Sequence, residues 1–185
     1  MPKYSLIYAD PPWVYRDKAN AGKRGAAHKY SCMTVPELCA LPVRKIAADD
    51  CLLAMWWVAP MPEEALAVVK AWGFTLKTMK GFTWRKLTVN GAEHFGMGNW
   101  TRANSEDCLF ATRGRPQRVS ADVRQIITAI VRDHSRKPRE ARERLVRLFG
   151  DVPRVELFAR DTAAGWAVWG DQVDGSIALP EEVTI

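Results

Sequence analysis

Short apolar runs separated by polar turns dominate the hydrophobic pattern of this chain. The first run, "KYSLIYA" at residues 3–9, stops at Asp10, and a second, "CLLAMWWV", fills residues 51–58. Continuous apolar runs of this length are typical of strands that are covered on both faces. The same reasoning, together with β-branched and aromatic content, predicts further strands at residues 74–86, 106–114, 122–131, 154–159 and 166–170.

Three other stretches carry the spacing and the end signals of helices. In "TVPEL", Thr34 is placed to cap a helix, and Glu37 follows three residues later and completes a capping box. The stretch "EEALAVVKAWG" (63–73) repeats apolar residues at i, i+4 and i+7 and ends at Gly73. The third, "SRKPREARERLVRLFG" (135–150), has a proline near its start, an apolar stripe and Gly150 at its end.

Strands that alternate with helices predict an α/β fold, with a largely parallel sheet and helices on both faces. In such sheets, ligands bind beyond the carboxyl ends of the strands, which is where Asp10 is expected. The length of 185 residues predicts one domain over residues 1–185. Polar, glycine-containing stretches at about 14–30 and 87–105 predict mobile loops, and loops of this length usually serve a function or are disordered.

The charge balance permits a polyanionic partner such as nucleic acid. The chain carries 27 Lys and Arg against 21 Asp and Glu, a formal net charge of +6. Residues 16–29 are basic and rich in Gly and Ala, so Lys18, Lys23 and Arg24 are candidate phosphate contacts. The alternative is an ordinary solvated loop.

The sequence shows no pattern for a metal site, a signal peptide or a membrane span. The four cysteines form no CxxC pair and lack metal-ligand spacing with any histidine, so no metal is predicted. No apolar run approaches the roughly 18 residues that cross a bilayer. Free thiols and these absences predict a cytoplasmic protein without membrane association.

The four residues after the first strand, Asp10-Pro11-Pro12-Trp13, suit the chemistry of an aromatic amino group. Such a nitrogen is a poor nucleophile because its lone pair is delocalised into the ring. Asp10 offers a charged acceptor for one N–H, and the Pro11 carbonyl, held in direction by Pro12, offers a second. Trp13 is a candidate stacking surface for a base, which would have to be flipped out of a duplex. The alternative is a solvated turn with a core tryptophan.

Several stretches in fixed order extend this interpretation from Leu6 to about Gly175. They are "ADPPW", "KYSCMTVPEL", "CLLAMWWV", "GFTWRK", "GMGNWTRANSEDCLFATRG", "HSRKPRE", "VELFAR" and "GWAVWGDQVDG". In this order they resemble the DPPW-type N6-adenine methyltransferases, the family of the catalytic subunit of the mRNA N6-adenosine methyltransferase and of bacterial and phage adenine methyltransferases. The resemblance implies a circularly permuted Rossmann-like fold that uses S-adenosylmethionine (SAM), with the catalytic turn first and part of the cofactor site last.

The resemblance also implies roles for individual residues. Asp10, Pro11, Pro12 and Trp13 would form the catalytic turn. Tyr30 and Glu106 would lie near the target base. The residues implied in cofactor binding are Asp10, Lys137 (near the methionine carboxylate), Glu156, Leu157, Phe158, Arg160 (near the ribose), Asp171 and Gln172 (near ribose and adenine).

The chain departs from the family pattern at three places. The chain starts nine residues before Asp10, so an upstream acidic contact to the SAM adenine is expected to be missing or to be supplied otherwise. The family His-Asn pair is replaced by Asp161-Thr162-Ala163, and the Asn of an Asn-Gln pair is Asp171. The expected activity is methylation of adenine N6, in DNA more than in RNA, by a possible homodimer. Alternatives are N4-cytosine methylation, RNA adenine methylation and a catalytically silent nucleic-acid-binding subunit.

Overall fold

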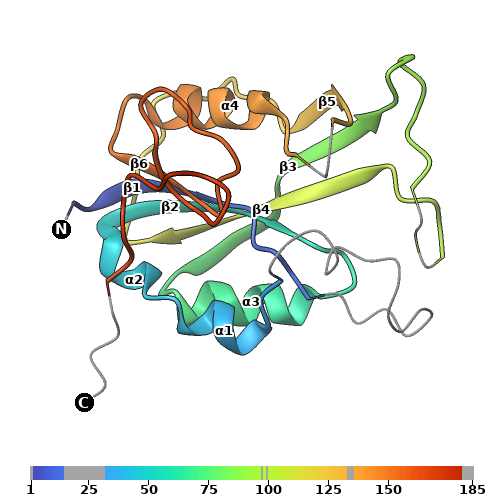
Figure 1. Cartoon of the computed structure of the whole chain (residues 1–185). Coiled ribbons are helices and arrows are strands. Elements are labelled where there is room, and N and C mark those ends of the chain that lie inside the picture. Colours follow the sequence, from blue (N-terminus) through green and yellow to red (C-terminus); the bar gives the residue numbers. More distant parts are fainter. Residues whose placement is uncertain (1, 15–31, 97, 99, 133–135, 181–185) are drawn as a thin grey trace.

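The computed structural model describes residues 2–14, 32–96, 98, 100–132 and 136–180. Seven strands and four helices are assigned within these ranges (Figure 1). In chain order they are β1 (Tyr4–Ala9), α1 (Val35–Ala40), α2 (Val43–Ile46), β2 (Ala47–Trp57), α3 (Pro62–Ala71), β3 (Thr75–Leu87), β4 (Ser105–Arg113), β5 (Ile126–Ile130), α4 (Arg139–Phe149), β6 (Arg154–Leu157) and β7 (Ala167–Trp169).

All seven strands belong to one sheet with the order β5-β3-β4-β2-β1-β6-β7. Strand β4 pairs antiparallel with both β2 and β3, while the β1–β2, β1–β6, β3–β5 and β6–β7 pairs are parallel. Six strands therefore share one direction and only β4 opposes them, which confirms the predicted largely parallel α/β sheet. The fold is that of a Rossmann-like methyltransferase.

Helices cover both faces of the sheet, as the uninterrupted apolar strands predict. Helices α1, α2 and α3 lie on one face and α4 lies on the other (Figure 1). The first face buries Leu38 of α1 and Val68 of α3 against β1 and β2, and the second buries Leu145 of α4. The central strands of the sheet, which lie between these two helical layers, therefore have no solvent-exposed face. The predictions for 51–58 as a strand and for 63–73 and 135–150 as helical segments are confirmed.

Local signals end and begin the helices where the sequence places them. Thr34 Oγ1 accepts the Glu37 N–H, and the Glu37 carboxylate accepts the Thr34 N–H at 2.7 Å, so the capping box of α1 is complete. Gly73 after α3 and Gly150 after α4 have φ of 82° and 79°, a backbone region that favours glycine. These turns return the chain to the sheet within a few residues.

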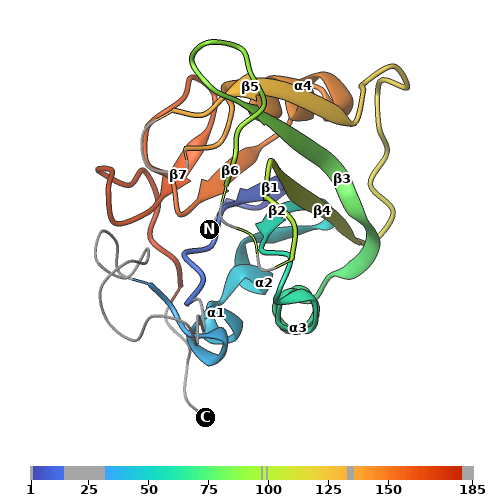
Figure 2. The ribbon, with the colours of Figure 1, turned by 90° about the vertical axis from the view of Figure 1, so that its right-hand side faces the viewer.

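The connectivity of the sheet places a crevice at its centre. After β1 the chain adds strands β2 to β5 on one side of β1, where they lie in the spatial order β2, β4, β3, β5. Only after α4 does the chain return to add β6 and β7 on the other side of β1. The first and the last parts of the chain therefore meet between β1 and β6 (Figure 2). Such a reversal of strand order is where open α/β sheets bind ligands, beyond the carboxyl ends of the strands.

The stretch 87–105 joins β3 to β4 as an extended hairpin rather than as a structureless loop. An isolated bridge pairs Leu87 with Glu93, and the Gly96 N–H donates to the Ala103 carbonyl at 2.9 Å. The predicted mobility of 87–105 and of 14–30 stays a prediction, as does the organisation of 1–185 as one domain.

Candidate active site

Asp10 directly follows β1, and backbone hydrogen bonds fix the turn that it begins. The Trp13 N–H donates to the Pro11 carbonyl at 3.0 Å, and the Met33 N–H donates to the Pro12 carbonyl at 2.9 Å. The Trp13 N–H therefore occupies one acceptor position of the Pro11 carbonyl. Because a carbonyl oxygen has two lone pairs, the Pro11 oxygen keeps one acceptor position.

The Trp13 indole lies in the hydrophobic core. Only 7% of Trp13 is exposed, and its Nε1 donates to the Trp56 carbonyl at 3.3 Å. A ring covered to this extent has no free face for a base, so the predicted stacking role of Trp13 is corrected. The side chain instead anchors the catalytic turn to the sheet, which is the alternative that the sequence left open.

Lys137 is the central charge of the site. Its Nζ lies 2.8 Å from Asp10 Oδ1 and 3.0 Å from Asp10 Oδ2, and 3.2 Å from Glu106 Oε2. The other Glu106 oxygen lies 2.5 Å from Lys86 Nζ. Asp10, Lys137, Glu106 and Lys86 thus form one line of alternating charges, which we call the charge row. It joins residues that are far apart in the sequence: the end of β1, the end of β3, the start of β4 and the residues before α4.

The charge row is nearly closed to water, yet it stays ionised. The side chains of Lys137 and Lys86 are 12% and 14% exposed. Burial opposes the charge on Lys137, but Asp10 and Glu106 outweigh it and raise the pKa of Lys137 above its usual value. Burial likewise raises the pKa of Glu106, but the two ammonium groups together hold that pKa below its usual value. Lys137 and Glu106 are therefore charged at neutral pH.

A pocket of about 320 Å³ opens beside Asp10 in the crevice between β1 and β6. Residues from the turn after β1 and from the segments after β6 and β7 line it. It contains five of the predicted cofactor residues, including Asp10 itself. The lining consists of Asp10, Pro12, Met33, Phe158, Arg160, Trp169, Gly170, Asp171 and Gln172.

The wall of this pocket after β6 and β7 is tightly built. Phe158 has a φ of 60°, a left-handed conformation that is costly for a side chain and that concentrates at functional sites. Its ring packs edge-to-face on Trp169 at a centroid distance of 5.3 Å. A β-carbon on Gly170 would lie 2.4 Å from the Ala159 carbonyl oxygen, so only glycine allows this approach. The aromatic wall is held in place before any ligand arrives.

Two of the predicted cofactor residues lie behind the pocket rather than in its lining. Leu157 is fully buried, and its carbonyl accepts the Asp10 N–H at 3.5 Å. Glu156 is 8% exposed and accepts from Arg142 at 3.0 Å, while Arg142 also donates to Asp161 at 2.9 Å. Leu157 and Glu156 thus support Asp10 and the segment after β6.

The Glu156 carboxyl gives the protein a pH-dependent stability. Burial raises the pKa of Glu156 to about 7 from an ordinary 4.5; the Arg142 ion pair opposes this rise, and the Asp161 and Asp10 carboxylates add to it. The folded state then binds more protons than the unfolded state between about pH 4.5 and 7, so stability is lost as the pH rises through this window.

We therefore expect Glu156→Gln to flatten the pH dependence of unfolding. The free energy of unfolding of the wild type, measured with urea, should fall by about a few kcal/mol between about pH 4.5 and 7. The free energy of unfolding of the variant should not show this fall. The difference between the two proteins isolates this carboxyl from all the others. Parallel curves for the two proteins across this window would show that Glu156 does not titrate there.

A second pocket of about 370 Å³ lies at the other end of the charge row. Glu106 and Lys86 belong to its lining, together with His94, Gly96 and Ala103 of the β3–β4 hairpin and with residues that follow β2. Glu106, predicted to lie near the target base, therefore lines a cavity on the hairpin side and contacts Lys137, which in turn contacts Asp10. The remaining predicted substrate contacts, Tyr30, Lys18, Lys23 and Arg24, lie outside the described residues.

Sequence reasoning missed two charged groups that complete the site. Lys86 holds Glu106, and it stands in the quoted stretch "GFTWRK" without having been assigned a role. Arg142 pairs with Glu156 and Asp161 although it lies on α4, and Asp161 also pairs with Arg136 at 2.8 Å. The signal for Arg142 was its position next to Ala141 on the apolar side of the helix.

The comparison with known families identifies the protein family to which this chain belongs. A family model described as MT-A70 matches residues 4–172, which include the charge row and the lining of the Asp10 pocket. The chain belongs to the MT-A70 family. This confirms the resemblance seen in the ordered sequence stretches.

Three relatives show how widely this MT-A70 domain is shared. The Type II methyltransferase M.MunI of a Mycoplasma species is 32% identical, with 97% of this chain and 82% of the relative aligned. The N6-methyladenosine RNA methyltransferase MTA1 of Cryphonectria parasitica is also 32% identical, over 93% of this chain and 52% of the relative. The N(6)-adenosine-methyltransferase subunit METTL3 of Danio rerio is 27% identical, over 98% and 30%.

The chain therefore spans most of M.MunI, about half of MTA1 and under a third of METTL3. All three relatives carry a methyltransferase name. The MT-A70 chain described here is a methyltransferase of this family.

Within the described ranges, no set of three His, Cys, Asp or Glu side chains is arranged to hold a metal ion. No helix of the described chain combines the length and the apolar character that crossing a membrane requires. Cys32, Cys39, Cys51 and Cys108 are free thiols.

Proposed function

We propose that this MT-A70 protein transfers a methyl group from SAM to the N6 amino group of adenine in nucleic acid, with DNA as the favoured substrate. The observation that carries the proposal is the position of Asp10. It directly follows β1, lines the pocket in the β1–β6 crevice and contacts the Lys137 ammonium at 2.8 Å. The family and the names of its relatives support methyl transfer to adenine.

The residues of the Asp10 pocket fit SAM in chemistry and in size. About 320 Å³ lies within the range of pockets that take a small organic ligand. Asp171 and Gln172 offer acceptors and donors for a ribose diol and an adenine edge, and Phe158 offers an apolar face. Asp10 suits an ammonium group, and Arg160 can donate to ribose oxygens, the position that the resemblance implies for it. The methionine carboxylate suits a cation. Lys137 lies next to Asp10 and would serve the same carboxylate.

SAM, when bound, supplies an electrophilic methyl group next to a positive sulfur. The protein's part is to make the adenine nitrogen a nucleophile. Asp10 accepts one N6–H, and the free lone pair of the Pro11 carbonyl accepts the other, which favours a pyramidal nitrogen with an available lone pair. The positive charge that develops on this nitrogen is stabilised by Asp10, which is also positioned to take up the proton that N6 must lose.

The charge row holds Asp10 in a fixed position. Lys137 contacts both Asp10 oxygens, while Glu106 and Lys86 hold Lys137 from the other end. Because three charged groups in addition to Asp10 are fixed, little reorganisation is required when substrate arrives.

The pocket of about 370 Å³ near Glu106 is the proposed entry for the target base. A base stacked in a duplex cannot reach Asp10, so adenine must be flipped out. Cytosine presents an amino group with the same nucleophile problem, so N4-cytosine methylation stays the alternative of the same chemistry. A homodimer and a cytoplasmic location stay predictions.

The proposed preference for DNA is supported by the share of each relative's length that aligns with this chain. The chain spans 82% of the Type II methyltransferase but only 52% and 47% of the two relatives named MTA1 RNA methyltransferases. We expect methyl transfer from radiolabelled SAM to DNA to exceed transfer to RNA of the same sequence by about ten-fold, since the ribose 2′-OH distinguishes the two at a fitted site. Equal or faster labelling of RNA would make the protein an RNA methyltransferase.

A further inference from the structure

The hairpin between β3 and β4 exposes an unusual set of large side chains. Val89 is 79% exposed, Phe95 74% and Trp100 fully exposed, all within one connecting segment. Single exposed apolar residues are ordinary, but a fully exposed tryptophan together with a second aromatic ring on one segment suggests a contact surface. In Figure 1, β3 and β4 carry this segment away from the helices.

The tip of this hairpin is closed by backbone contacts. The Gly96 N–H donates to the Ala103 carbonyl at 2.9 Å, and a β-carbon on Gly96 would lie 2.4 Å from that oxygen. At Gly98 a β-carbon would lie 2.1 Å from the Thr101 carbonyl oxygen. Both glycines permit a backbone approach that a side chain would block, so the tip is a tight turn that holds Trp100 outward.

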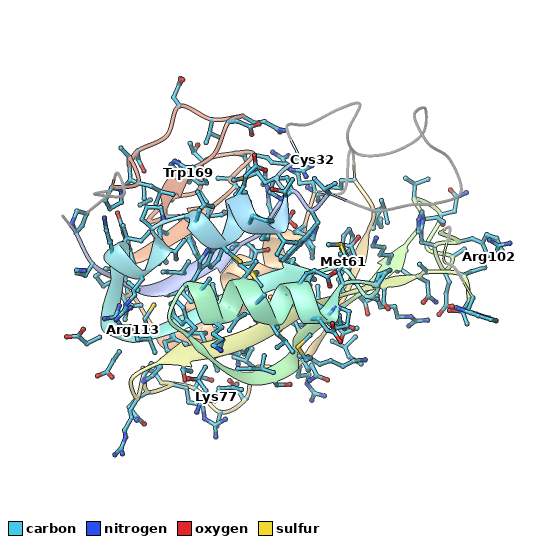
Figure 3. All side chains as sticks on the ribbon, turned by 90° about the horizontal axis from the view of Figure 1, so that it is seen from below. Cys32, Met61, Lys77, Arg102, Arg113 and Trp169 are labelled. Atoms are coloured by element: carbon cyan, nitrogen blue, oxygen red, sulfur yellow. The ribbon has the colours of Figure 1, made fainter. Side chains whose placement is uncertain are left out.

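A cation accompanies the aromatic rings. The Arg102 guanidinium lies 5.1 Å from the centre of the Phe95 ring, a cation–π contact. Figure 3 shows Arg102 at the outer end of the hairpin, far from α1 and α3. Among the described residues, no acid forms an ion pair with Arg102, whereas Arg85 further along β3 is neutralised by Glu93 at 2.6 Å. The tip therefore combines two aromatic rings with one positive charge that no described acid neutralises.

The hairpin also reaches the candidate active site. Its residues His94, Gly96 and Ala103 line the pocket of about 370 Å³ that Glu106 and Lys86 share. The exposed rings of Phe95 and Trp100 lie on the same hairpin as these lining residues. Aromatic rings beside basic groups bind nucleic-acid strands, because every base has a face that can stack and every linkage carries a negative charge.

We propose that the β3–β4 hairpin binds the DNA strand beside the flipped adenine through Phe95, Trp100 and Arg102, with the Trp100 indole stacking on a neighbouring base. The inference rests on the proposed function. Phe95 and Arg102 lie on the same hairpin as Trp100. The Phe95 ring would make an apolar contact with the strand, and the Arg102 guanidinium would contact a phosphate. Extrusion of one base breaks its stacking with its neighbours, and an aromatic ring at the mouth of the pocket replaces part of that lost contact.

The test compares Trp100→Ala with Trp100→Phe and with Val89→Ala in the full chain. Val89→Ala is the matched control because it removes exposed apolar surface from the same hairpin without removing a ring. The probe is a fluorescein-labelled 30-base single-stranded DNA of mixed sequence, read by anisotropy, with methyl transfer to the same DNA and SAM affinity by calorimetry measured in parallel.

Trp100→Ala should weaken DNA binding by about five-fold or more, the range for loss of one base–aromatic stack, while SAM affinity stays at the wild-type value. Trp100→Phe and Val89→Ala should stay within about two-fold of the wild type, since the first keeps a stacking face. Equal DNA affinity of Trp100→Ala and wild type would overturn the inference. So would a change from dimer to monomer in light scattering with DNA affinity unchanged, because the surface would then bind a second copy of the chain. Failure of the wild type to methylate any substrate would instead overturn the proposed function.

Discussion

Asp10→Asn is expected to lower the turnover of methyl transfer by about 10²–10³-fold, the loss that follows removal of one preorganised electrostatic contact. Asparagine keeps the shape of the side chain but removes its charge and turns one acceptor into a donor. That donor would face the N6–H of adenine or the Lys137 ammonium. The Pro11 carbonyl alone cannot then hold both N–H groups of the base.

The fold should survive this change. Lys137 keeps Glu106 as a partner at 3.2 Å, so the buried ammonium is not left without a counter-charge. We expect the melting temperature of Asp10→Asn to stay within about 2–4 °C of the wild type, which for a chain of this length corresponds to about 1 kcal/mol. Wild-type turnover in a folded Asp10→Asn protein would rule out the acceptor role of Asp10.

Lys137→Met is expected to weaken SAM binding by about ten-fold or more, the effect of losing a charge-assisted hydrogen bond. Methionine keeps an apolar chain and removes the cation, whose Nζ lies 5.5 Å from the centre of the Trp56 ring. Turnover should fall as well, because Asp10 and Glu106 then face each other without Lys137 between them. Repulsion between the two carboxylates would displace Asp10 from the position that the reaction needs.

Arg139→Met is the matched control for this experiment, since Arg139 is an exposed cation two residues further along the chain. It should leave SAM affinity unchanged in calorimetry, and Lys137→Arg should restore part of the loss. If Lys137→Met binds SAM as tightly as the wild type, the cofactor role of Lys137 is wrong and the residue acts only through Asp10.

The fold could be predicted well from the sequence because its signals are local. The apolar runs at 3–9 and 51–58 have no polar face, so they had to be strands buried under helices, and the capping box at Thr34 fixed a helix start. The antiparallel direction of β4 could not be predicted. The run 106–114 looks the same in either direction, and the direction is fixed only by pairing with β2 and β3.

The site residues that belong to short sequence motifs could be predicted. The contacts between residues that are distant in the sequence could not. Asp10, Arg160, Asp171 and Gln172 reach one pocket, as the ordered stretches implied. The sequence offered two environments for Trp13, and only packing against Trp56 chose between them. The contact of Lys137 with Asp10 spans 127 positions, and no periodicity carries information over that separation.

The central claim is tested most directly by the chemical identity of the product. Purified protein, SAM and unmethylated DNA should yield N6-methyladenine, and no N4-methylcytosine, when the DNA is digested to nucleosides and analysed by mass spectrometry. The same reaction with Asp10→Asn should yield neither. N4-methylcytosine as the sole product would contradict adenine as the substrate, and N6-methyladenine formed equally by the variant would contradict Asp10 as the acceptor.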